Sequence, residues 1–151
     1  MEQPRHLRGF FCSFKMMNPL GFGKQERLKS RKRIDALFAE GKSVVAFPVR
    51  VKYQFVPLTE GTVPVQAGVS VSRKAFKRAV DRNRIKRLLR EAYRLQKKDF
   101  VTTVMEKSMQ GQLFFIYTDK AMASFQVVYK AVGACLQQLQ QKANTYHENR
   151  Y

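Results

Sequence analysis

The chain has 151 residues, with 29 lysines and arginines against 11 aspartates and glutamates, which gives a formal net charge of +18. Apolar residues make up 44%, enough for the core of one domain, which argues against a wholly disordered chain. So large a surplus opposes compaction through self-repulsion, so nucleic acid is the first partner class to consider. No run of about 18 apolar residues is present, so neither a membrane-spanning helix nor a membrane partner is expected.

Few residues suit a metal centre or nucleophilic catalysis. The two cysteines, Cys12 and Cys135, are far apart, and the two histidines, His6 and His147, lie near the termini. These spacings match no ligand set, and the cysteines are interpreted as reduced thiols of a cytosolic protein. The acidic residues are scattered, whereas a protein-only metal nuclease would need clustered carboxylates to hold Mg²⁺. We therefore expect neither a catalytic residue nor a metal ligand in this chain.

Residues 1–23 have no sustained hydrophobic period and are interpreted as a flexible N-terminal extension. A short helix is predicted to follow, with Ser30 as its N-cap and Gly41 as its stop. Its apolar face includes Ile34 and Phe38. The folded domain is therefore expected to begin with a helix.

Extended chain is predicted over residues 44–56, where apolar and polar residues alternate. Pro48 indicates a break or an edge position within this stretch. A turn over residues 57–64 leads to a further strand at residues 65–72. These segments favour a sheet with one covered face.

The charge is concentrated in residues 73–98. This segment has twelve lysines and arginines and two acids, Asp81 and Glu91, a net of 12 − 2 = +10. If residues 80–98 are helical, at about 100° per residue, aliphatic side chains share one face. Those residues are Ile85, Leu88, Leu89, Ala92 and Leu95. The opposite side carries the cations Arg82, Lys86, Arg90, Arg94 and Lys97.

This cation stripe favours nucleic-acid binding. Like charges at i,i+4 spacing destabilise a helix by about 0.2–0.5 kcal/mol per pair, and a phosphate backbone relieves that repulsion. An ordinary solvated helix face would mix the two signs of charge. A membrane-surface or calmodulin-binding helix would expose Trp or Phe on its apolar stripe, whereas this stripe contains Ile, Leu and Ala.

The last third of the chain contributes a strand and a helix. Residues 112–118 predict a short apolar strand in the centre of the sheet, and residues 121–142 predict a long helix. Residues 143–151 are interpreted as a polar tail. The order α-β-β(-β)-α-β-α predicts an α+β fold, a two-layer sandwich formed by one domain over residues 24–142.

The run VSVSRKAFKRAVDRNRIKRLLREAY, from Val69 to Tyr93, closely resembles the signature of the bacterial ribonuclease P protein subunit. The hallmark of that family, Arg-Asn-Arg followed by x-Lys-Arg and x-x-Arg, is matched here by Arg82, Asn83, Arg84, Lys86, Arg87 and Arg90. The resemblance extends over roughly residues 24–140 and includes Arg27-Leu28-Lys29 and Gly41-Lys42-Ser43. It implies the family fold, which has a left-handed βαβ crossover.

The resemblance implies an RNA-binding subunit that assists a catalytic RNA in removing the 5′ leader from precursor tRNA in the bacterial cytoplasm. The RNA, with Mg²⁺ that it holds itself, would perform the hydrolysis. The protein would add affinity for the leader. Two alternatives stay open at this point: a noncatalytic structural or ribosome-associated RNA-binding protein, and a protein-only nuclease.

The resemblance also assigns roles to residues. RNA contact is assigned to Lys74, Lys77, Arg78, Arg82, Asn83, Arg84, Lys86, Arg87, Arg90 and Arg94, most of them donors suited to phosphate oxygens. A leader cleft between the first helix and the sheet is assigned to Ile34, Phe38 and Tyr53. Ile34 replaces an aromatic residue frequent in the family, and Lys77-Arg78 replaces its usual Gly-Asn, which adds charge before the basic helix.

Overall fold

The computed structural model describes residues 21–59 and 62–149. Its elements are η1 (Lys24–Glu26), α2 (Arg31–Glu40), β1 (Lys42–Ala46), β2 (Val49–Pro57), β3 (Val65–Val71), α3 (Ala79–Glu106), β4 (Met109–Tyr117) and α4 (Phe125–Asn149). This order confirms the predicted α+β class and the predicted succession of helices and strands.

The four strands form one sheet in the order β1-β2-β4-β3. β2 pairs antiparallel with both β1 and β4, whereas β3 pairs parallel with β4. β4 therefore has a neighbour on each side, as its apolar sequence predicts. Pro48 separates β1 from β2 through a cis Phe47-Pro48 peptide bond, which confirms the predicted break in the extended chain.

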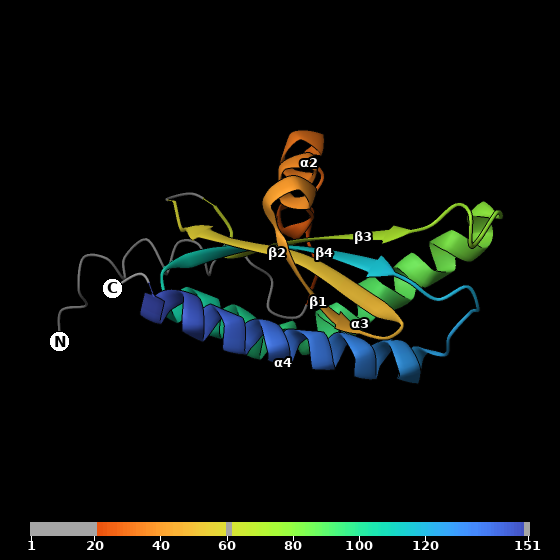
Figure 1. Ribbon diagram of the computed structural model, residues 1–151. Coiled ribbons are helices and arrows are strands. Elements are labelled where there is room, and N and C mark those ends of the chain that lie inside the picture. Colours follow the sequence, from red (N-terminus) through yellow and green to blue (C-terminus); the bar gives the residue numbers. More distant parts are fainter. Residues whose placement is uncertain (1–20, 60–61, 150–151) are drawn as a thin grey trace.

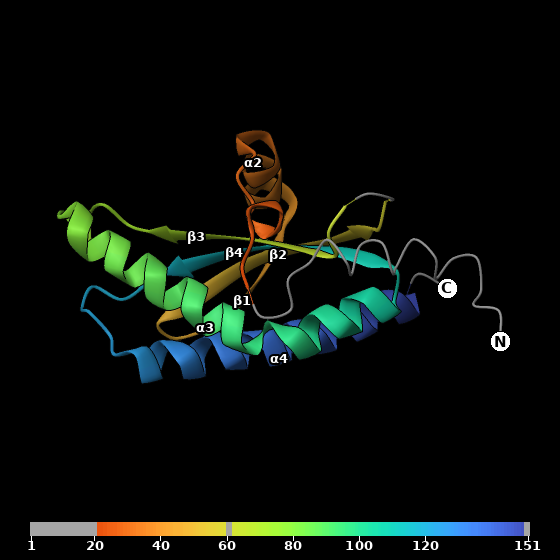
Figure 2. The ribbon, with the colours of Figure 1, turned by 180° about the vertical axis from the view of Figure 1, so that it is seen from behind.

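The sheet has helices on both faces. α3 and α4 lie side by side against one face, and α2 stands on the other (Figures 1 and 2). In Figure 1 the parallel strands β3 and β4 both run to the right, β3 lies behind β4, and α3 returns beneath them. That connection has the left-handed sense that the resemblance implies.

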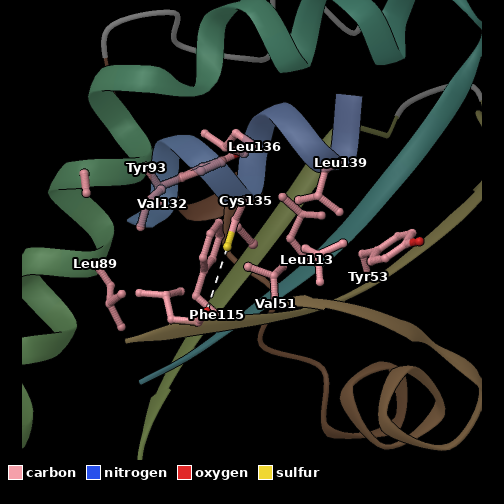
Figure 3. Packing of buried hydrophobic residues seen from close by; sticks show 14 of the residues in the cluster. Val51, Tyr53, Leu89, Tyr93, Leu113, Phe115, Val132, Cys135, Leu136 and Leu139 are labelled. Atoms are coloured by element: carbon pink, nitrogen blue, oxygen red, sulfur yellow. Dashed lines mark hydrogen bonds between the residues drawn. The ribbon is translucent and has the colours of Figure 1, made fainter. Parts of the chain in front are cut away.

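The main core fills the space between the sheet and the pair α3 and α4. Alternate residues of β2 face it, which gives the strand its buried positions Val49, Val51, Tyr53 and Phe55. Figure 3 shows side chains of β2 and β4 meeting those of α3 and α4, with Leu113 and Phe115 of β4 among them. Because these side chains come from elements distant in sequence, tertiary packing supplies most of the stability of the helices.

Cys135 belongs to this core. Its thiol lies 3.9 Å from the carbonyl oxygen of Val49 (Figure 3), and burial raises its pKa to about 11. The raised pKa leaves the group a protonated thiol at neutral pH, which agrees with the interpretation of Cys135 as a reduced cysteine.

The last helix is longer than predicted. α4 continues to Asn149, Ala143 is buried, and the ring of Tyr146 lies 5.9 Å from that of Phe55. The apolar spacing of Leu139, Ala143 and Tyr146 extends the helical stripe through the many glutamines of this region. The predicted polar tail is therefore the end of α4 up to residue 149, while residues 150–151 lie outside the described residues.

The start of the domain is also earlier than predicted. Phe22 packs edge-on against Tyr93 of α3, with ring centroids 5.4 Å apart, and the backbone of Leu28 pairs with Ala67 of β3. Residues 21–23 therefore belong to the folded domain, which corrects the boundary at residue 24. Residues 1–20, the remainder of the expected extension, lie outside the described residues.

The buried face of α3 differs from the predicted stripe. Ile85, Leu89 and Ala92 are buried as predicted, but Leu95 is 50% exposed and Lys97 is 1% exposed. The second half of α3 is covered by α4 on one side and by residues 21–28 on another. These two neighbours together bury a different arc of the helix from the one that a single aliphatic stripe indicates.

Candidate nucleic-acid interface

The first half of α3 is held in place by the loop that precedes it. Phe76 is buried with its ring 5.9 Å from that of Tyr117, and the Ser72 hydroxyl accepts a hydrogen bond from the backbone N–H of Lys74 at 3.2 Å. Asp81 lies in the first turn, where a carboxylate is favoured by the helix dipole. The helix therefore starts at a fixed point after β3.

The structure places all ten residues assigned to RNA contact on this loop and on α3 up to Arg94, just past the middle of the helix. Six of them are exposed: Lys74, Lys77, Arg78, Asn83, Arg84 and Arg87. Four are half-buried: Arg82, Lys86, Arg90 and Arg94. Their proximity makes one cationic surface, in which Asp81 and Glu91 are the acids of the helix segment.

Arg82 has an internal role within this surface. Its Nη1 donates hydrogen bonds to the carbonyl oxygens of Phe76 at 2.9 Å and Lys77 at 2.8 Å. These bonds tie the loop to the first turn of α3 and satisfy carbonyls that would otherwise need water. Arg82 therefore shapes the start of the helix, and part of its donor capacity is committed to the protein.

Arg94 is paired with Glu91, one turn earlier on α3. The guanidinium Nε donates to the carboxylate at 3.0 Å, and the pair raises the pKa of Arg94 and lowers the pKa of Glu91. Exposed pairs of this kind contribute little to stability, about 0–1 kcal/mol. The pair does reduce the positive charge that this turn of the helix presents to solvent.

Lys97 departs from the predicted cation stripe altogether. Its Nζ lies in the interior, paired with the buried carboxylate of Glu26 and donating to the carbonyl oxygen of Gly21. An ammonium group enters a protein interior only when such partners replace its water. The cationic surface therefore ends before Lys97. Nothing in the sequence pattern indicated that Glu26, 71 positions earlier, would be its partner.

Arg27 is a functional candidate that the sequence reasoning did not include among the site residues. It is exposed, and its Cζ lies 5.5 Å from the centroid of the Phe22 ring. Burial lowers the pKa of Arg90, and so does the charge of Arg27. Arg27 thus adds a cation to the surface from a segment 63 positions before Arg90 (90 − 27).

The two residues of α2 assigned to a leader cleft lie on the opposite face of the sheet from α3. Ile34 packs beside Phe114 of β4, and the Phe38 ring meets Phe114 edge-on at 5.2 Å while remaining 41% exposed. Gly68 of β3 lets the Phe114 ring approach, because a Cβ there would lie 2.8 Å from it. An apolar surface with one available ring therefore forms beneath α2.

Tyr53 does not join these residues. It is 5% exposed and packs in the main core, its ring 5.5 Å from that of Phe55, and burial raises its pKa. This placement corrects the prediction of a shared cleft, and the reason is parity: residues of β2 alternate between the two faces of the sheet.

The same parity identifies Arg50 and Lys52 on the α2 face. In the register of β2 with β4, Arg50 is opposite Ile116 and Lys52 is opposite Phe114. Arg50 is exposed and Lys52 is half-buried. The alternation of apolar and polar residues in the sequence of β2 already indicated that Arg50 and Lys52 share a face that Tyr53 does not.

Two features that other functions would need are absent from the described residues. Across residues 21–59 and 62–149, no group of three or more His, Cys, Asp or Glu side chains is arranged to hold a metal ion. Over the same ranges, no helix combines the length and the apolar character needed to cross a bilayer.

Comparison with known proteins places this geometry in context. Residues 22–140 match the protein family described as Ribonuclease P. The ribonuclease P protein component of Porphyromonas gingivalis is 38% identical over 123 residues, which cover 80% of this chain and 89% of that protein. The ribonuclease P protein component of Chlorobium phaeobacteroides is 32% identical over 119 residues, covering 73% of this chain and 82% of that protein.

A solved structure shows the same fold. The ribonuclease P protein of Staphylococcus aureus superimposes with a TM-score of 0.59 at 22% identity, covering 76% of this chain and 94% of that one. The family match covers residues 22–140, and curated members of the family are more than 30% identical over most of the chain, so this chain belongs to the Ribonuclease P protein family.

Proposed function

We propose that this chain is the RNA-binding protein subunit of ribonuclease P and assists a catalytic RNA in removing the 5′ leader from precursor tRNA in the bacterial cytoplasm. The family membership supports the assignment to ribonuclease P. The observation that carries the RNA-binding role is the cationic surface on the first half of α3, where exposed arginines and lysines are anchored by a buried core. Such side chains suit phosphate oxygens.

In this proposal the catalytic centre belongs to the RNA, which holds the Mg²⁺ that activates water for phosphodiester hydrolysis. The protein binds and orients. Its α3 surface contacts the catalytic RNA, and the surface beneath α2 receives the leader. Phe38 offers a ring for an unpaired base there, and Arg50 and Lys52 offer cations to the leader backbone.

Reconstitution at low Mg²⁺ concentration tests the proposal. Adding the protein to a bacterial ribonuclease P RNA should restore correct leader removal under conditions in which the RNA alone is inactive. Binding to that RNA without stimulated cleavage would favour a noncatalytic RNA-binding protein instead. Cleavage by an RNase-free preparation of the protein without any RNA subunit would favour a protein-only nuclease.

The leader surface is tested by comparing two substrates. Phe38→Leu and Lys52→Gln should weaken binding of a precursor tRNA with a leader while leaving binding of mature tRNA by the reconstituted complex unchanged. Lys130→Gln, the same loss of charge at an exposed position of α4 on the other side of the sheet, is the matched control. Equal weakening of binding for both substrates would show that the leader does not bind to the surface beneath α2.

A further inference from the structure

Residues 21–28 bring a second arginine beside the cationic surface of α3. Arg27 and Arg90, together with Phe22, line one surface hollow. Within residues 21–59 and 62–149, neither guanidinium forms an ion pair with a carboxylate. Arg87 and Arg94 line the same hollow, so four arginines face a common space in which the one carboxylate among the described residues, Glu91, is bound to Arg94.

The position of Arg27 is fixed by three contacts around it. The buried carboxylate of Glu26, its neighbour, pairs with Lys97 of α3. The backbone of Arg27 bridges to Ala67 at the edge of β3, and the Phe22 ring beneath the guanidinium packs on Tyr93. Holding one arginine beside another in this way opposes charge repulsion, so the arrangement is built to receive an anion.

We propose that Arg27 and Arg90 form a two-armed clamp for a single phosphate group of the RNA partner, with the Glu26–Lys97 ion pair as its positioning device. This inference rests on the proposed function, and it adds a contact from outside the arginine-rich segment. A guanidinium donates two parallel hydrogen bonds to phosphate oxygens, so two of them from different elements can enclose one group. One phosphate between them also removes their mutual repulsion.

The clamp is tested with the full-length protein and a bacterial ribonuclease P RNA transcript, by measuring affinity over a range of salt concentrations. Arg27→Gln and Arg90→Gln should each weaken binding by about 10- to 150-fold, the effect of a charge-assisted hydrogen bond. Because both arms hold one phosphate, the double variant should lose less than the product of the two single losses. The slope of log K against log salt should change by about 0.7–0.9, the value for one phosphate.

Two comparisons make the result decisive. Combining Arg27→Gln with Arg84→Gln, an exposed cation on another side of α3, should give additive losses and twice the change in slope. Lys130→Gln, an exposed change on α4, should leave both quantities unaltered. Additive losses for Arg27 and Arg90 with a two-phosphate change in slope would overturn the clamp, as would wild-type affinity in either single variant.

The positioning role has its own test. Replacing the ion pair by Glu26→Leu with Lys97→Met should lower RNA affinity about as much as Arg27→Gln does, and adding Arg27→Gln to that background should change little. A full further loss would show that Arg27 is positioned without the ion pair. Failure of the wild-type protein to bind the RNA would contradict the proposed function itself, whereas binding with unaffected Arg27 variants would contradict the clamp alone.

Discussion

Arg90 and Lys97 are two cations on nearly the same side of one helix, and their surroundings differ completely. Arg90 lies half-buried at the edge of a solvent-facing hollow, whereas Lys97, two turns later, is paired with Glu26 in the interior. Residues 21–28 leave an open hollow beside Arg90, whereas they cover Lys97 completely. A cation stripe is therefore a binding surface only as far as the rest of the chain leaves it uncovered.

Breaking the buried pair should have the largest effect. Lys97→Met leaves the Glu26 carboxylate buried without its partner, which should lower the free energy of unfolding by about 3–5 kcal/mol. Urea unfolding measures this loss. Arg90→Met is the matched change on the first half of the helix and should leave stability nearly unaltered. The double variant with Lys97→Met and Glu26→Leu should recover most of the loss. If Lys97→Met and Arg90→Met were equally stable, the contrast between the two positions would be wrong.

A cavity beneath the cationic surface should come next. Leu89 is fully buried between α3 and the sheet, so Leu89→Ala should destabilise the protein by about 2–5 kcal/mol. Leu88, its neighbour in sequence, is half-buried, and Leu88→Ala should cost less. The melting temperatures of the two variants show which of the two leucines faces the core. A larger fall in melting temperature for Leu88→Ala than for Leu89→Ala would contradict the burial of Leu89 described above.

Exposed arginines should affect binding instead of folding. Arg87→Ala should weaken RNA binding by about 1–3 kcal/mol while the melting temperature stays close to that of the wild type. Arg82→Ala should in addition lower the melting temperature, because it removes the hydrogen bonds to the Phe76 and Lys77 carbonyls. Binding titrations and melting curves on the two proteins separate the roles, and identical melting losses would show that Arg82 has no internal one.

The smallest expected effect is a pH dependence from Cys135. Its folded pKa of about 11 lies above the value of 9.0 of an unperturbed thiol, so the folded state favours the protonated form. The contribution to stability is complete below pH 9 and is lost as the pH rises toward 11. Between pH 8 and 9.5 the wild type should lose about 1 kcal/mol more than Cys135→Ala in urea unfolding. Parallel pH profiles for the two proteins would show that the thiol is not shielded from water.

Most of the fold was predictable from local patterns. Alternation in β2, the helical period of α3 and the apolar run in β4 each indicate an element, because burial of one face requires those spacings. The density of arginine in α3 likewise indicated a polyanionic partner. These features depend on neighbours within one element, which the order of residues specifies directly.

The details of the site depended on contacts between elements. The sequence predicted that β2 has two faces, but α2 and α4 decided that Tyr53 points into the main core while Lys52 lies with Phe38 on the other face. It predicted a continuous line of cations, but the approach of residues 21–28 neutralised Lys97 and brought Arg27 to Arg90. Periodicity specifies the direction in which a side chain leaves its helix or strand. Only tertiary structure specifies what lies in that direction, whether solvent, an apolar core or the opposite charge.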